Sequence, residues 1–173
     1  MEETLGEAGK ALWSYWTSLR DGALVPARED FNPMAIARQL PVVSLLEQEG
    51  PLTWRVRLVG TEIVRRSGDL KGRNYIDLLV PEQREREDRR LATMVNYPCG
   101  SHAIRENRRP SSTGYFVRTV ALPLWSKDGT RRFVIATNEE INRERLGRET
   151  GLNEIRIERV FLDVGAGLPA PVE

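Results

Sequence analysis

The chain has 173 residues, of which 40% are hydrophobic and 29% are charged. This composition is typical of a globular protein, and the length fits one domain with a short appended arm. The 26 basic and 25 acidic residues leave a formal net charge of +1, which argues against a general attraction to nucleic acid or to an anionic membrane.

The single cysteine, Cys99, excludes an internal disulfide and a multi-cysteine zinc site, so we expect no metal centre. Residues 1–10 are acidic and polar, unlike a secretory signal. No apolar run approaches the ~20 residues that are needed to span a bilayer. We therefore expect a cytoplasmic protein that does not enter a membrane.

An amphipathic helix is predicted over residues 4–21, because apolar residues recur there at spacings of three and four. Its apolar stripe must be covered either by the sheet or by the same helix of a second chain. We therefore name Leu12, Trp13, Trp16 and Leu19 as candidate contacts of a homodimer. The helix and a proline-punctuated connector make up residues 1–40, the main domain residues 41–165, and a tail residues 166–173.

Two strands are predicted at residues 42–47 and 52–59, separated by a turn at Glu49-Gly50-Pro51. Short helical segments are expected at 61–66 and 74–79, and a longer helix at 81–95. Eight charged residues crowd that helix between positions 82 and 90, which we interpret as a solvated face with i, i+4 pairs.

Three more strands are predicted at residues 101–107, 115–125 and 132–138, and an additional C-terminal strand at 155–164. The Asp128-Gly129 pair between two of them is typical of a hairpin turn. In the strand at 52–59, apolar and arginine residues alternate, which indicates an antiparallel sheet with one wet face. The expected class is α+β, an antiparallel sheet with short helices across one face.

Several short motifs follow one another in order along residues 11–125. They are Trp16 with Leu19-Arg20, Pro26-Ala27-Arg28 before Asp30 and Pro33, Leu40-Pro41, Arg57-Leu58-Val59-Gly60-Thr61, and turns at Gly68 and Gly72-Arg73. In order and spacing they resemble a family of stand-alone bacterial PAS-like proteins, mostly alphaproteobacterial. The resemblance implies a five-stranded sheet with a ligand or a partner held between it and the helices that cross it.

The function implied by this resemblance is that of a non-catalytic sensory or regulatory domain. Such a domain binds a small ligand or a protein partner and signals in trans through that partner, since the sequence shows no kinase, cyclase or DNA-binding segment. The alternative is an adaptor with a filled core and no ligand. A nucleotide-binding or nucleic-acid-binding protein and an enzyme are the less favoured readings.

Candidate ligand-binding residues are chosen from strand alternation and from their positions relative to the family that the chain resembles. They are Trp54, Arg57, Tyr75, Phe116 and Trp125. Because Arg57 lies on the opposite strand face from Trp54, at most one of these two is expected to point inward.

Flavin and heme are both disfavoured. Gly72-Arg73-Asn74 is similar to the light-oxygen-voltage motif, but Tyr75 stands where that motif has the cysteine that bonds to flavin, and Cys99 lies 24 residues further on. The one histidine, His102, stands in a polar stretch and is interpreted as a surface residue rather than a heme ligand. A catalytic triad would have to be built on His102, whose neighbour Ser101 points to the opposite face of a strand.

Four pairs of arginines could contact phosphate groups, but acidic residues interleave with them on the long helix. We therefore interpret most of this charge as solvated. Arg105, Arg108 and Arg109, near a strand edge, are the remaining candidates for an anion site.

Overall fold

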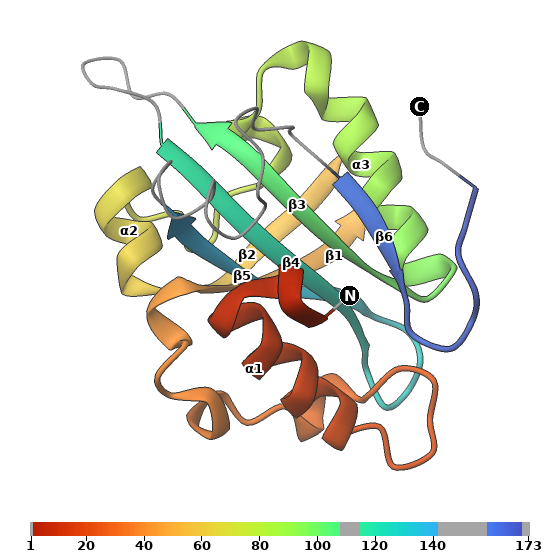
Figure 1. The fold of residues 1–173 in the computed structure, drawn as a ribbon. Coiled ribbons are helices and arrows are strands. Elements are labelled where there is room, and N and C mark those ends of the chain that lie inside the picture. Colours follow the sequence, from red (N-terminus) through yellow and green to blue (C-terminus); the bar gives the residue numbers. More distant parts are fainter. Residues whose placement is uncertain (1, 108–114, 142–158, 171–173) are drawn as a thin grey trace.

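The computed structural model describes residues 2–107, 115–141 and 159–170. Within these residues the strands form one sheet of six in the order β2-β1-β5-β4-β3-β6 (Figure 1). Every neighbouring pair is antiparallel, and the pairing of β1 with β5 joins the first hairpin to the later strands. The predicted α+β fold with an antiparallel sheet is therefore confirmed.

The strands lie close to their predicted positions. They are β1 (Val43–Gly50), β2 (Thr53–Val59), β3 (Cys99–Asn107), β4 (Tyr115–Trp125), β5 (Arg132–Ile141) and β6 (Arg159–Asp163). The additional C-terminal strand is confirmed as β6, which pairs with β3 and extends the expected five-stranded sheet by one strand. Residues 155–158 of that prediction lie outside the described residues.

The helical segments fall into two groups on either side of the first hairpin. Before it come η1 (Glu2–Leu5), α1 (Gly6–Ser18), η2 (Arg28–Asp30), η3 (Pro33–Ile36) and η4 (Leu40–Val42). Between β2 and β3 lies the helical insert, residues 61–96, with α2 (Thr61–Ser67), η5 (Ile76–Leu78) and α3 (Pro81–Asn96). None of the helices in the described residues is long and apolar enough for a membrane span.

Helices cover both faces of the sheet (Figure 1). Successive residues of a strand point to opposite faces, so neighbours such as Leu45 and Leu46 belong to different core clusters. Leu45 packs in the cluster that contains α1, whereas Leu46 packs in the cluster that contains the helical insert. The insert crosses one face as predicted, and α1 closes the other.

The apolar stripe of α1 is buried within the chain itself. Leu12 is 0% exposed and Trp16 is 1% exposed, and Trp16 Nε1 donates a hydrogen bond of 2.7 Å to the Pro123 carbonyl oxygen. These two residues are corrected from candidate dimer contacts to core residues, because the sheet already covers them. Trp13 and Leu19 are half-buried beside the same core, and homodimerisation stays a prediction.

Gly60 fixes where the helical insert leaves β2. A Cβ at this position would overlap the carbonyl oxygens of Leu40 and Pro41, so only glycine fits against that backbone. The Gly60 N–H donates to Val43 O at 2.8 Å and ties the turn to β1. Gly60 also occupies the N-cap position of α2.

Candidate functional site

A cavity of about 230 Å³ lies between the inner face of the sheet and the helical insert. One part of its lining is apolar: Leu46 of β1, Val56 of β2, Ala121 of β4, and Val134 and Ala136 of β5. Two of these five residues are alanines, so the sheet leaves room where larger side chains would fill the space. Leu91 of α3 faces this apolar part from the other side.

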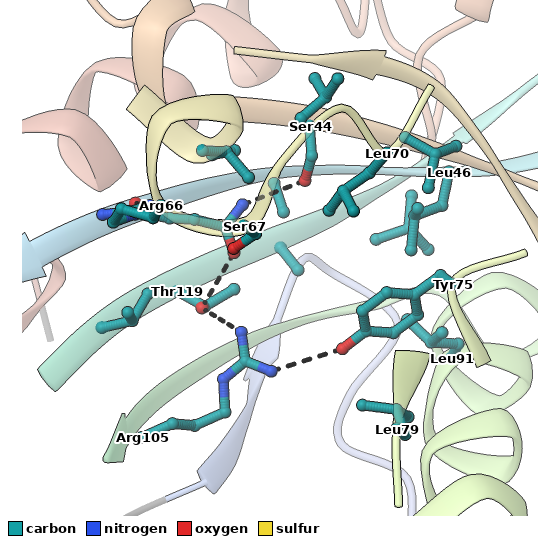
Figure 2. A pocket seen from close by; sticks show the side chains of 18 of the residues that line it. Ser44, Leu46, Arg66, Ser67, Leu70, Tyr75, Leu79, Leu91, Arg105 and Thr119 are labelled. Carbon is teal, nitrogen blue, oxygen red and sulfur yellow. Dashed lines mark hydrogen bonds between the residues drawn. The ribbon is translucent and has the colours of Figure 1, made fainter. Parts of the chain in front are cut away.

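The other part of the lining is a polar band that crosses four strands. Arg105 Nη2 donates to Thr119 Oγ1 at 3.1 Å, Thr119 Oγ1 donates to Asn138 Oδ1 at 3.3 Å, and Asn138 Nδ2 donates to Ser44 Oγ at 3.0 Å. Figure 2 shows these bonds running from β3 across β4 and β5 to β1, with Tyr75 of the insert facing Arg105. Arg105 Nη1 donates to the Tyr75 hydroxyl at 3.3 Å.

A buried carboxylate, Glu87 of α3, lies behind this band and is 3% exposed. It accepts bonds from Arg90 Nη2 at 2.7 Å, from Arg159 Nη1 at 3.0 Å and from the Tyr75 hydroxyl at 3.1 Å. Burial alone would raise the pKa of Glu87, but the positive charges of Arg90, Arg105 and Arg159 lower it to about 2. Glu87 is therefore ionised over the whole physiological range.

In the described lining of the cavity, positive charge exceeds negative charge. Three guanidinium groups, those of Arg90, Arg105 and Arg159, act on the single carboxylate of Glu87. Burial lowers the pKa of Arg159, the attraction of Glu87 acts in the opposite direction, and the repulsion of Arg105 and Arg90 adds to the lowering. Burial raises the pKa of the Tyr75 hydroxyl, which therefore stays neutral and does not offset the surplus.

Arg66 of α2 adds a further positive charge to the lining. Its side chain is 4% exposed and lies 3.6 Å from a carboxylate oxygen of Glu140, and its Nη2 donates to the Asn138 carbonyl oxygen at 2.7 Å. Within the described part of the chain, the cavity lining contains three arginines and no aspartate or glutamate. The arrangement can therefore receive an anion or an acceptor-rich group beside an apolar body.

The PAS domain family model matches residues 6–136, which include α1, the first hairpin, the insert and most of the later strands. The chain belongs to the PAS domain family. PAS domains are in general sensory, non-catalytic modules, which agrees in outline with the predicted class of function. The match does not address a bacterial origin, which stays a prediction.

Solved structures with a likeness to this PAS domain are distant. The light-state structure of the blue-light photoreceptor Aureochrome1 LOV is 12% identical, covers 68% of this chain and 94% of that chain, and has a TM-score of 0.47. A Rhodobacter sphaeroides LOV protein is 12% identical over 70% of this chain and 74% of that chain, with a TM-score of 0.47.

A sensory box sensor histidine kinase from Vibrio cholerae is 16% identical over 65% of this chain and 97% of that chain, with a TM-score of 0.40. The comparison with curated proteins gives no match. The choice of ligand must therefore be argued from this chain's own residues.

Of the predicted ligand-binding residues, the structure places Tyr75 in the cavity lining. Trp54 points to the same side of the sheet but is fully buried in the core, where its Nε1 donates to Asp88 Oδ1 at 2.8 Å. Trp125 lies at the end of β4, and its Nε1 donates to Val95 O at 3.0 Å. Both tryptophans therefore join the sheet to α3 rather than lining the cavity.

The two other predicted ligand residues lie away from the cavity. The Arg57 side chain is 44% exposed and forms ion pairs with Glu47 and Glu49. Phe116 packs with Ile104 and Ile141 in a separate small cluster. Strand alternation had left open whether Trp54 or Arg57 points inward, and Trp54 is the one that does.

Of the predicted anion-site residues, Arg105 lines the cavity. Arg108 and Arg109 lie outside the described residues. The structure thus brings together Arg105 and Tyr75, which were predicted for different reasons and are 30 residues apart in the sequence.

Sequence reasoning missed Arg66, Glu87, Arg90 and Arg159 as residues of this site. Glu87 and Arg90 were interpreted as part of a solvated helix face, which is wrong because Glu87 is buried. The signal was present, since Glu87 precedes Leu91 by four residues and Met94 by seven and so shares their helix face. Arg159 carries no comparable signal, because its position depends on the pairing of β6 with β3.

The residues present do not fit a photochemically bonded flavin. Tyr75 lines the cavity where a reactive cysteine would be required. Cys99 is buried in the core beside α3, outside the cavity lining, and burial raises the pKa of its thiol to about 12. In that environment the Cys99 thiol is neutral and unreactive.

His102 is buried in β3, where it is 7% exposed between Val120 of β4 and Val160 of β6. The interpretation of His102 as a surface residue is therefore wrong. It borders a second, more open hollow of about 650 Å³ beside β6, together with Arg159, Phe161 and Leu168. The expectation that no heme is bound stays a prediction.

Proposed function

We propose that this PAS domain is a sensory module that binds a small ligand between its sheet and its helical insert and passes the signal to a protein partner. The observation that carries the proposal is the cavity of about 230 Å³, which combines an apolar part with buried hydrogen-bonding groups. Arg105 Nε is buried and has no hydrogen-bond partner among the described residues. A buried unpaired donor is costly, and a ligand acceptor would satisfy it.

The cavity wall also offers a route for the signal. Residues of α2, of α3 and of the segment between them line the cavity, and the same segments carry exposed surface. A ligand that favours one position of the insert would change the surface that a partner meets. This step needs no catalytic group.

The proposal is tested first on the protein purified without denaturation, by native mass spectrometry for a retained small molecule. Binding of a panel of three compounds, benzoate, benzamide and benzylamine, is then measured by thermal shift and calorimetry. These compounds share one size and differ in charge. We expect at least one retained molecule or one panel member to bind with a stoichiometry of one.

The matched variants are Ala136→Leu, which fills the apolar part of the cavity, and Ala35→Leu on the exposed turn η3. Binding should disappear in the first variant and persist in the second. If the wild-type protein retains no molecule and responds to no panel member, the ligand-binding proposal is overturned and the ligand-free adaptor is supported.

A further inference from the structure

The charge of the cavity lining indicates the chemical class of the ligand. Arg90 and Arg159 both donate to Glu87, whereas Arg105 donates only to the neutral hydroxyl groups of Tyr75 and Thr119 among the described residues. The Arg105 side chain is half-buried, with its Nε atom buried, and a charge withdrawn from water normally has a partner of opposite sign because the loss of hydration is costly. Arg105 is therefore the group in this cavity whose charge a ligand would compensate.

The donors of Arg105 are only partly used. Its guanidinium carries five N–H groups, and the two hydrogen bonds to Tyr75 and Thr119 leave Nε and further N–H groups of the terminal nitrogens for an acceptor. A planar guanidinium offers paired parallel donors that match the two oxygens of a carboxylate. The hydroxyl groups of Thr119 and Tyr75 hold the guanidinium in place for that contact.

The apolar part of the lining begins directly beside this polar band. Along β4 the cavity face changes from Thr119 to Ala121, and along β5 it changes from Asn138 to Ala136 and Val134. One end of a bound molecule would therefore meet Arg105 while its body met alanine and aliphatic side chains. The volume of about 230 Å³ is below the ~300 Å³ at which pockets for drug-sized ligands begin, so the molecule must be compact.

We infer that the ligand of this cavity is a small organic carboxylate, with its head group on Arg105 and its compact apolar body against Ala121, Val134 and Leu46. This inference rests on the proposed function and names the chemical class of its ligand. A phosphate ester shares the anionic chemistry and can also meet a guanidinium fork with two of its oxygens, so the experiment separates the two.

The test compares benzoate with benzamide, benzylamine and phenyl phosphate by calorimetry on the full chain. Benzoate and benzamide have nearly the same shape and differ in charge. We expect benzoate to bind at least about tenfold more tightly than benzamide, because only the carboxylate compensates the charge of Arg105. Benzylamine should give no detectable binding, since its cation would add to the positive surplus.

Three variants locate the head group. Arg105→Gln should weaken benzoate binding by at least about tenfold and leave benzamide binding unchanged, which also shows that the cavity is still formed. Arg105→Lys keeps the charge but loses the fork, so it should restore only part of the affinity. Arg89→Gln, which removes an exposed arginine from the same helix as Arg90, should change neither affinity.

Each outcome bears on one of the two proposals. If benzamide binds as tightly as benzoate, or if Arg105→Gln leaves benzoate binding unchanged, the carboxylate inference is overturned while the ligand-binding function stands. If phenyl phosphate binds more tightly than benzoate, the ligand class is a phosphate ester instead. If no compound binds and no molecule is retained, the proposed function itself fails.

Discussion

Arg105 of β3 donates to the hydroxyl of Tyr75 in the helical insert at 3.3 Å, and that hydroxyl in turn contacts Glu87 of α3 at 3.1 Å. A neutral phenol thus connects a sheet arginine to a helix carboxylate inside the fold. Tyr75→Phe removes both contacts and leaves the charged groups with fewer partners. We expect the free energy of unfolding to fall by about 1–3 kcal/mol.

The control for this substitution is Tyr97→Phe. The Tyr97 hydroxyl donates to Ala166 O at 2.9 Å, but this bond is exposed and its loss should cost at most about 0.5 kcal/mol. Urea denaturation of both variants measures the difference. Equal effects of the two substitutions would contradict the role given to Tyr75.

Glu87→Gln should be strongly destabilising at neutral pH. It leaves Arg90 and Arg159 without their buried carboxylate, and breaking a buried pair of this kind costs about 3–5 kcal/mol. The matched control is Glu85→Gln on the same helix, whose ion pair with Arg89 is exposed and should contribute less than about 0.5 kcal/mol.

The effect of Glu87 should also depend on pH. Its folded-state pKa is lowered to about 2 from an ordinary value of 4.5, so the folded protein binds fewer protons at this site than the unfolded chain. The stabilisation is therefore fully present above about pH 4.5 and is lost as the pH falls toward 2. The stability difference between wild type and Glu87→Gln should shrink over this window, and a difference that stays constant would contradict the assignment.

Leu12→Ala tests the docking of α1 on the sheet. Leu12 is completely buried, and truncation of a core leucine typically costs about 2–5 kcal/mol through lost burial and the cavity left behind. Thr17→Ala changes an exposed residue of the same helix and should stay within about 0.5 kcal/mol of wild type. If the larger loss appeared only as a concentration-dependent change in oligomeric state, Leu12 would belong to an interface after all.

Gly60→Ala should destabilise the protein by about 1–3 kcal/mol, because the added methyl group meets two backbone carbonyl oxygens that cannot move aside cheaply. Gly50→Ala is the comparison, since a Cβ there meets nothing within 4 Å. Thermal denaturation compares the stability of the two variants. Equal losses of stability would contradict the role given to the close approach of Gly60 to the Leu40 and Pro41 carbonyl oxygens.

The thiol of Cys99 should react slowly with iodoacetamide in the native protein at pH 8. Its side chain is buried and its pKa is raised to about 12, so both access and the thiolate fraction are low. The same chain in urea should be labelled at least about a hundredfold faster. Rapid labelling of the native protein would show that this part of the core opens readily.

Much of the fold could be predicted from the sequence because its signals are local. The alternation in β2 and the Asp128-Gly129 turn each act over a few residues, and the elements lie where these patterns placed them. The turn at Gly68 is local in the same sense, and this glycine caps the end of α2 with a positive φ.

The site could be predicted only in pieces, because its geometry depends on register between distant strands. Thr119 meets Asn138 through the pairing of β4 with β5, and no short-range pattern states that pairing. His102 was misplaced for the same reason, since β6 turns its strand from an edge into an interior one. Glu87 was hidden among charged neighbours on α3 and could be recognised only from its spacing to Leu91 and Met94.

The helical insert is one continuous stretch of chain, and the core that α1 forms with the opposite face of the sheet contains none of its residues. We therefore expect the cavity wall to open as a local cooperative unit while the remainder stays folded. Entry of a molecule then requires the opening free energy of residues 61–96 alone, and amide hydrogens there should exchange sooner than those of β4 and β5. The insert would move about its junctions with β2 and β3. A molecule bound in the cavity would then change the fraction of time that the insert is open.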